Sequence, residues 1–75
     1  SVDDEKLFFR TVRAAFAQRR KTLSNALRSA FSELDRAAIE SAMEETGLPP
    51  AVRGETLSIA QFAALSNALL RKFDK

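Results

Sequence analysis

The stretch FFRTVRAAFAQRRKTLSNALRSAF, residues 8–31, indicates the fold class of this 75-residue chain. Its apolar residues recur every three or four positions, which is the period of an amphipathic α-helix. The first half carries the stripe Phe8, Val12, Ala15 and Phe16, widened by Phe9. The second half carries Leu23, Ala26, Leu27, Ala30 and Phe31. We predict one helix over residues 4–18 and another from about residue 21 to 31. Propensity does not decide whether they are continuous, because Arg, Lys and Gln all favour helix.

A third helix is expected to begin at Ser32, which is a candidate N-cap. Asp35, three residues later, stands in for the Glu of a capping box. This helix should end at Thr46, because Gly47 supplies the left-handed residue that commonly ends a helix. The Pro-Pro pair at 49–50 then prevents continuation.

Residues 47–57 hold both glycines and both prolines and are expected to form a connector. Ser58 opens the last helix, with Gln61 at the reciprocal capping-box position. The helical period continues through Ile59, Phe62, Leu65 or Ser66, Leu69 and Phe73. No run alternates in the manner of a strand. The sequence therefore predicts an all-α fold, a small bundle of four to five short helices in a single domain spanning residues 1–75.

The six Phe residues are interpreted as core, because the stripes of the predicted helices carry most of them and no Tyr or Trp accompanies them. Aromatic side chains that stack on nucleic-acid bases must be exposed. Base stacking is therefore not an expected role for these rings.

The residue types that carry most chemistry are absent or sparse. The chain has no His and no Cys, which removes the commonest general base and the usual zinc ligands. Its two glycines cannot build a phosphate-cradling loop. Glu40, Glu44 and Glu45 can share part of a helix face, but such carboxylates are usually solvated. We expect no catalytic, cofactor or metal site in this segment, no membrane span, and a cytoplasmic location.

Charge is divided unevenly along the chain. Residues 1–31 hold seven basic and three acidic side chains, whereas residues 32–75 hold five basic and seven acidic ones. The predicted phosphate contacts are Arg10, Arg13, Arg19, Arg20, Lys21 and Arg28. Such a ridge would bind nucleic acid through its phosphates with an affinity that falls as salt rises. The same cluster could instead complement a helix dipole and keep the surface solvated.

The run FRTVRAAFAQRRKTL, residues 9–23, resembles the opening of the C-terminal helical domain of bacterial small-subunit ribosomal RNA adenine dimethyltransferases, the KsgA/RsmA family. The run RGETLS, residues 53–58, is similar to the last characteristic stretch of that domain, together with Gln61, Phe62, Leu65 and Asn67–Leu69. The resemblance covers residues 3–70. Ser24 departs from a position that is often basic, which removes one phosphate contact. Gly54 replaces a common Ala or Pro, which we expect to matter only to the connector.

The resemblance implies a parent enzyme that uses S-adenosylmethionine to place two methyl groups on N6 of each of two adjacent adenosines. These adenosines lie near the 3′ end of small-subunit rRNA and must leave their stack to be reached. The Rossmann-like catalytic domain is not in these residues, so this segment is expected to be inactive alone. Its implied role is to dock the enzyme on the immature small subunit, with rRNA and its own catalytic domain as partners. A helix-turn-helix-like DNA-binding module and a purely structural domain remain as alternatives.

Overall fold

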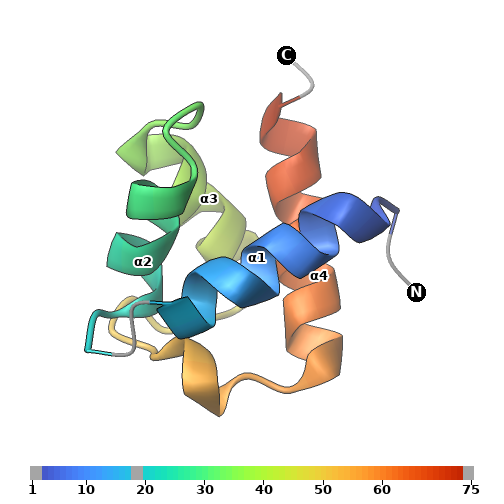
Figure 1. The fold of residues 1–75 in the computed structure, drawn as a ribbon. Helices are drawn as coiled ribbons and strands as arrows, with labels where there is room; N and C mark the ends of the chain where they lie inside the picture. Colours follow the sequence, from blue (N-terminus) through green and yellow to red (C-terminus); the bar gives the residue numbers. More distant parts are fainter. Residues whose placement is uncertain (1–2, 18–19, 74–75) are drawn as a thin grey trace.

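Four α-helices and one 3₁₀ turn follow one another in the part of the chain that the computed structural model describes, residues 3–17 and 20–73 (Figure 1). They are α1 (Glu5–Ala17), α2 (Leu23–Ala30), α3 (Arg36–Glu45), η1 (Gly54–Thr56) and α4 (Ile59–Phe73). The described residues contain no strand. The prediction of an all-α bundle is confirmed.

The helices enclose one apolar core. α1 crosses in front of α4 and also packs on α2, α3 packs on both α2 and α4, and η1 lies against α1 (Figure 1). The largest fully buried apolar side chains come from α2, α3, α4 and the turn after α2: Phe31, Leu23, Leu27, Ile39, Leu65 and Leu69. The chain has no cysteine, and the described residues contain no group of three potential metal ligands. Packing of this core is therefore the main source of stability that the structure shows for a chain of this size.

α1 and α2 are separate helices, which propensity left undecided. The Thr22 side chain caps α2 by accepting a hydrogen bond from the backbone N–H of Asn25. The next N–H, that of Leu23, donates to the carbonyl of Val52 at 2.8 Å. α2 therefore begins at Leu23, two residues later than predicted, because this region pairs with the connector. Gln18, the predicted last residue of the first helix, lies outside the described residues.

The predicted N-cap of α3 is wrong. The cap is Asp35, whose carboxylate accepts a hydrogen bond from the N–H of Ala38 at 2.8 Å. Ser32 lies in the preceding turn, where the N–H of Leu34 donates to the carbonyl of Phe31 at 3.1 Å. Phe31 is fully buried, and the turn that follows it reverses the chain before α3 begins. The helix start is thereby moved three residues along the chain.

The predicted end of α3 and start of α4 are confirmed. Gly47 has φ +72°, its N–H donates to Glu44 and that of Leu48 donates to Met43, which is the paired bonding of a Schellman motif. At α4, the Ser58 N–H donates to the Gln61 side chain at 2.8 Å, and the Gln61 N–H donates to the Ser58 hydroxyl at 3.1 Å. Both ends are formed by bonds within five residues.

Gly54 contributes to packing, contrary to the expectation that it matters only to the connector. A Cβ at this position would lie 2.6 Å from the Cβ of Ala15. Glycine therefore lets η1 approach the backbone of α1 closely.

The expectation that all six Phe lie in the core is also wrong. Phe31 and Phe62 are buried and Phe8 and Phe73 are half-buried, but Phe9 is 59% exposed and Phe16 is 41% exposed. The inward face of α1 is instead formed by Leu7, Thr11, Ala14 and Ala15. Ala15 lies against Gly54 of η1, and the Thr11 hydroxyl is satisfied by donating to the carbonyl of Leu7 at 2.7 Å. Ile59, predicted on the buried stripe of α4, is 79% exposed.

Ion pairs connect the end of α3 to the end of α4. The Glu45 carboxylate accepts hydrogen bonds from Lys72 and from Arg71, the latter at 2.8 Å. Lys72 also donates to the Ser41 hydroxyl at 3.0 Å. The hydrogen bonds from Lys72 and Arg71 lower the pKa of Glu45 from 4.5 to about 2.

The cap assignment predicts different effects for two neighbouring substitutions. Asp35→Ala removes the acceptor for the Ala38 N–H and should lower the free energy of unfolding by about 1 kcal/mol. Ser32→Ala, the matched control, should change it by less than about 0.5 kcal/mol. Urea unfolding followed by circular dichroism measures both. A larger loss for Ser32→Ala would reinstate the cap predicted from the sequence.

The Glu45 cluster predicts a dependence of stability on pH. The folded-state pKa lies below the unfolded value of 4.5, so the carboxylate stabilises the fold above about pH 4.5. This contribution is lost as the pH falls from 4.5 toward 2. Urea unfolding should show a smaller loss over this range for Glu45→Gln than for the wild type. Glu44→Gln, its neighbour on α3, should retain the wild-type loss; equal curves for all three proteins would contradict the prediction.

Candidate nucleic-acid interface

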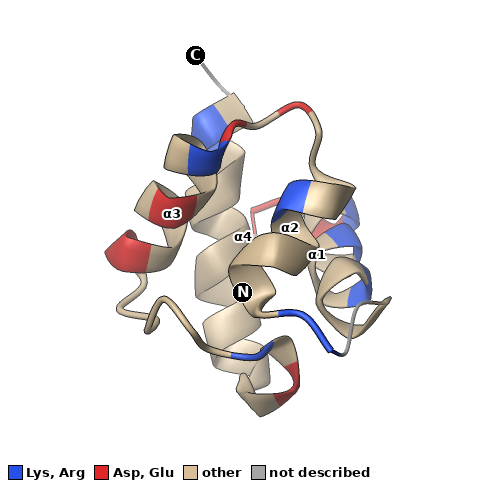
Figure 2. Cartoon of the chain, turned by 90° about the vertical axis from the view of Figure 1, so that its left-hand side faces the viewer, with Lys and Arg blue, Asp and Glu red and all other residues tan. Residues whose placement is uncertain are grey.

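The basic positions of α1, of the turn after it and of α2 lie on one side of the bundle, and further basic positions lie on α3, on α4 and before η1. Figure 2 shows the Lys and Arg positions of α1, of the turn after it and of α2 on one side, and the acidic positions of α3 on the other. The turn itself contributes Arg20 and Lys21. Arg19 lies outside the described residues.

Arg10, a predicted phosphate contact, is engaged with the chain itself. Its guanidinium donates to both carboxylate oxygens of Glu33, at 3.0 and 2.8 Å, and to the carbonyl of Ala30 at 2.9 Å. The guanidinium carbon Cζ of Arg10 lies 4.2 Å from the centre of the Phe31 ring. The hydrogen bond from Arg10 lowers the pKa of Glu33. Arg10 therefore links α1 to the end of α2 and closes over a buried ring.

The other described cations of the predicted set are exposed and form no ion pair with a described residue. They are Arg13, Arg20, Lys21 and Arg28, called here the basic surface. Lys21 Nζ donates to the Ser29 hydroxyl at 3.3 Å, which directs this side chain along α2. A cation without a carboxylate partner can bind a phosphate without first breaking an ion pair.

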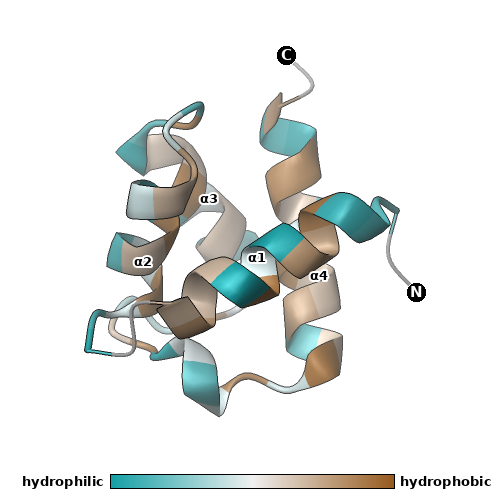
Figure 3. Ribbon diagram, in the orientation of Figure 1, coloured by the Kyte–Doolittle hydropathy of each residue, from teal (hydrophilic) through white to brown (hydrophobic). Residues whose placement is uncertain are grey.

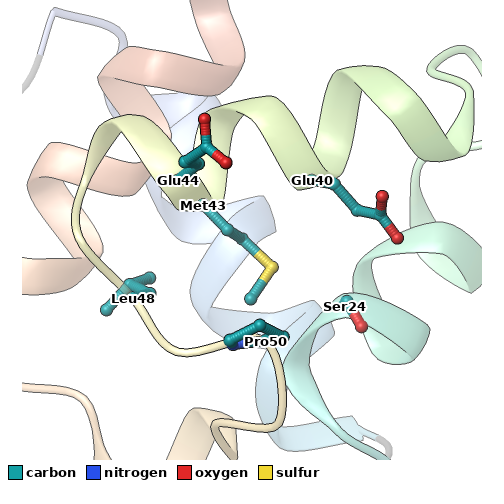
Figure 4. Close-up of a pocket in the computed structure, with 6 residues that line it drawn as sticks. All are labelled: Ser24, Glu40, Met43, Glu44, Leu48 and Pro50. Atoms are coloured by element: carbon teal, nitrogen blue, oxygen red, sulfur yellow. The ribbon is translucent and has the colours of Figure 1, made fainter.

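The groove between α2, α3 and the connector is unsuited to a polyanion. It has a volume of about 340 Å³ and is lined by Ser24, Glu40, Met43, Glu44, Leu48 and Pro50. Figure 4 shows the Met43 side chain reaching from α3 toward Pro50, with Glu40 pointing toward Ser24. Two carboxylates beside an apolar floor repel phosphate.

The described residues do not fit S-adenosylmethionine. Gly47 ends α3 and Gly54 packs on Ala15, so neither belongs to a loop that could cradle a cofactor. Among the described residues there is also no group of three potential metal ligands, and no helix long and apolar enough to cross a bilayer.

Two features of this side were missed from the sequence. Glu33 lies 23 positions from Arg10, and no spacing rule connects them. The outward position of Phe9 and Phe16 was missed because α1 carries apolar residues on more than one face. The small residues Ala14 and Ala15 were the available signal, since small side chains let a neighbouring segment approach a helix closely.

Comparison with known proteins gives one consistent group of relatives. No protein-family model matches the chain. It is 54% identical over 71 residues to ribosomal RNA small subunit methyltransferase A of Bacillus cytotoxicus, covering 92% of this chain and 24% of the relative. The protein of the same name from Geobacillus thermodenitrificans is 49% identical over 75 residues, covering 97% and 26%. That of Lactococcus lactis is 45% identical over 69 residues, covering 92% and 24%. The chain thus spans about a quarter of the length of the curated relatives it matches.

The contacts of Arg10 predict that neighbouring arginines of α1 differ in their effect on stability. Arg10→Ala removes a ring contact and a carbonyl hydrogen bond and should lower the free energy of unfolding by about 1 kcal/mol. Arg13→Ala, at an exposed position of the same helix, should change it by less than about 0.5 kcal/mol. Urea unfolding at neutral pH distinguishes the two. Equal effects would mean that Arg10 is as free as Arg13.

Proposed function

The chain belongs, as a segment of about a quarter of their length, to the ribosomal RNA small subunit methyltransferase A family, and we propose that it is the C-terminal RNA-docking domain of such an enzyme. The observation that carries the proposal is the basic surface on α1, the following turn and α2. It consists of exposed cations without described carboxylate partners, on the side of the bundle away from Glu40 and Glu44.

The basic surface would act through phosphates. Contacts to phosphate fix the position and orientation of a protein on RNA but carry little sequence information. We infer that Arg13, Arg20, Lys21 and Arg28 make such contacts together with Arg19. Arg10, which pairs with Glu33 and stacks on the Phe31 ring, would instead stabilise the packing of the helices that carry this surface. The domain would therefore position the enzyme, and another part of the enzyme would select the base.

The reaction belongs to the rest of the proposed enzyme. There, S-adenosylmethionine would supply methyl groups to N6 of two adjacent adenosines near the 3′ end of small-subunit rRNA, within the immature subunit in the cytoplasm. A domain that binds phosphates near the target raises the concentration of the catalytic part at those adenosines. This role needs no catalytic group in the domain itself.

RNA binding by this chain tests the proposal. The probe is a small-subunit rRNA hairpin, titrated by fluorescence anisotropy at several salt concentrations. We expect weak binding whose log affinity falls linearly with log salt, by about 0.7 to 0.9 per phosphate contact. Arg13→Ala/Arg20→Ala should reduce that slope by about 1.5 and weaken binding.

A control variant removes the same charge elsewhere. Arg36→Ala/Arg71→Ala takes away two arginines that are paired with Glu40 and Glu45. It should leave the slope near the wild-type value. An equal loss for both double variants would reduce the interaction to net charge and refute the docking surface. Tighter binding to a duplex DNA of one sequence would favour a DNA-binding module instead.

A further inference from the structure

α1 carries a second apolar face beside its buried one, on which the side chains of Phe9 and Phe16 are exposed. Phe9, Val12 and Phe16 are spaced by three and four residues, so they form one stripe along the helix. Phe9 is 59% exposed and Phe16 is 41% exposed, whereas Val12 is half-buried and also packs against the core. The buried face of the same helix is formed by other residues, Leu7, Thr11, Ala14 and Ala15. A helix that is apolar on two sides usually has partners on both.

The Phe16 end of this face lies beside the start of α4. The Phe16 ring lies 6.1 Å from the ring of the buried Phe62, and Ile59, one turn before Phe62, is 79% exposed. Figure 3 shows apolar ribbon on α1 and at the first turn of α4. We call Phe9, Val12, Phe16 and Ile59 the outer apolar stripe. Large apolar side chains gathered on one surface are typical of an interaction site.

The composition of the stripe favours a protein partner over RNA. Stacking on bases uses the face of an aromatic ring. Val12 and Ile59 have no ring, and Phe16 already contacts Phe62. Burial against apolar protein side chains suits all members of the stripe. Arg13 lies beside it on α1 and marks the border with the basic surface.

The lengths of the relatives identify an available partner. This chain corresponds to 24% to 26% of their length, so about three quarters of each relative is a neighbouring part of the same polypeptide. A covalently linked partner binds at a high effective concentration and needs only a modest surface.

We propose that the outer apolar stripe is the surface by which this domain docks on the methyltransferase part of the same polypeptide, which leaves the basic surface open to RNA. This inference rests on the proposed function and names the second partner of the domain. One helix, α1, then takes part in both contacts, so RNA bound at the basic surface would be held in a defined direction from the catalytic part.

The absence of cysteine from the chain permits a direct test by thiol labelling. Phe9→Cys and Ile59→Cys report on the stripe, and Ala37→Cys on the exposed side of α3 is the matched control. Ala68→Cys, at a fully buried position, reports on folding. Each is placed in this 75-residue chain and in a chimera, the Geobacillus thermodenitrificans methyltransferase with its matching segment replaced by this chain. The chimera without an introduced cysteine gives the background.

We expect maleimide to label the two stripe positions about tenfold more slowly in the chimera than in the isolated chain, without RNA. The control should label at the same rate in both, and the buried position slowly in both. Equal rates at the stripe would overturn the proposal, as would protection that appears only on adding rRNA. Protection in the isolated chain that grows with its concentration would assign the stripe to a second copy.

The outcomes separate this inference from the proposed function. If the stripe is protected in the chimera but Arg13→Ala/Arg20→Ala does not weaken RNA binding, the domain is a structural one and only the docking role on RNA fails. If RNA binding weakens as expected but the stripe stays reactive, only this inference fails.

Discussion

The close crossing of α1 over the rest of the bundle is the contact on which the other features depend. It is made by small residues, with Ala14 and Ala15 facing inward and Gly54 bringing η1 within reach of Ala15. Larger side chains on this face would hold the helices apart, because protein interiors tolerate little overlap. The crossing therefore determines how α1 is rotated about its own axis. That rotation decides which of its residues face the core, the α2 end and the surroundings.

The two arginines of α1 acquire different roles from this rotation. Arg10 meets Glu33 and the Phe31 ring, so it stabilises the joint between α1 and the turn before α3. Arg13 points away from the core and joins the exposed cations of the following turn and α2. A basic ridge that looks uniform in the sequence is thus one structural cation beside several available ones. Since an already paired guanidinium offers little to a phosphate, the two kinds are not interchangeable.

The same rotation also exposes aromatic side chains. Phe9 and Phe16 lie outside the core and, with Ile59, give the domain an exposed apolar surface in addition to its basic one. The apolar surface would bind a partner through the hydrophobic effect, and the basic surface through electrostatic attraction to phosphates. Burial of apolar surface is nearly independent of salt, whereas phosphate binding weakens steeply as salt rises. A small domain that carries both kinds of surface can bind two partners of different chemistry without competition between them.

The sequence by itself determined the all-α class and several helix ends. Gly47 ends α3, and Ser58 with Gln61 begins α4, because each of these ends is made by hydrogen bonds between residues at most five apart. It also located the basic residues of the candidate interface. Only the tertiary structure decided the cap of α3, where burial of Phe31 moves the start from Ser32 to Asp35. It likewise decided which face of α1 is buried, because the apolar residues of this helix are compatible with more than one orientation. The choice rests on packing against η1 and α4, which come about forty residues later, and local spacing carries no information about such partners.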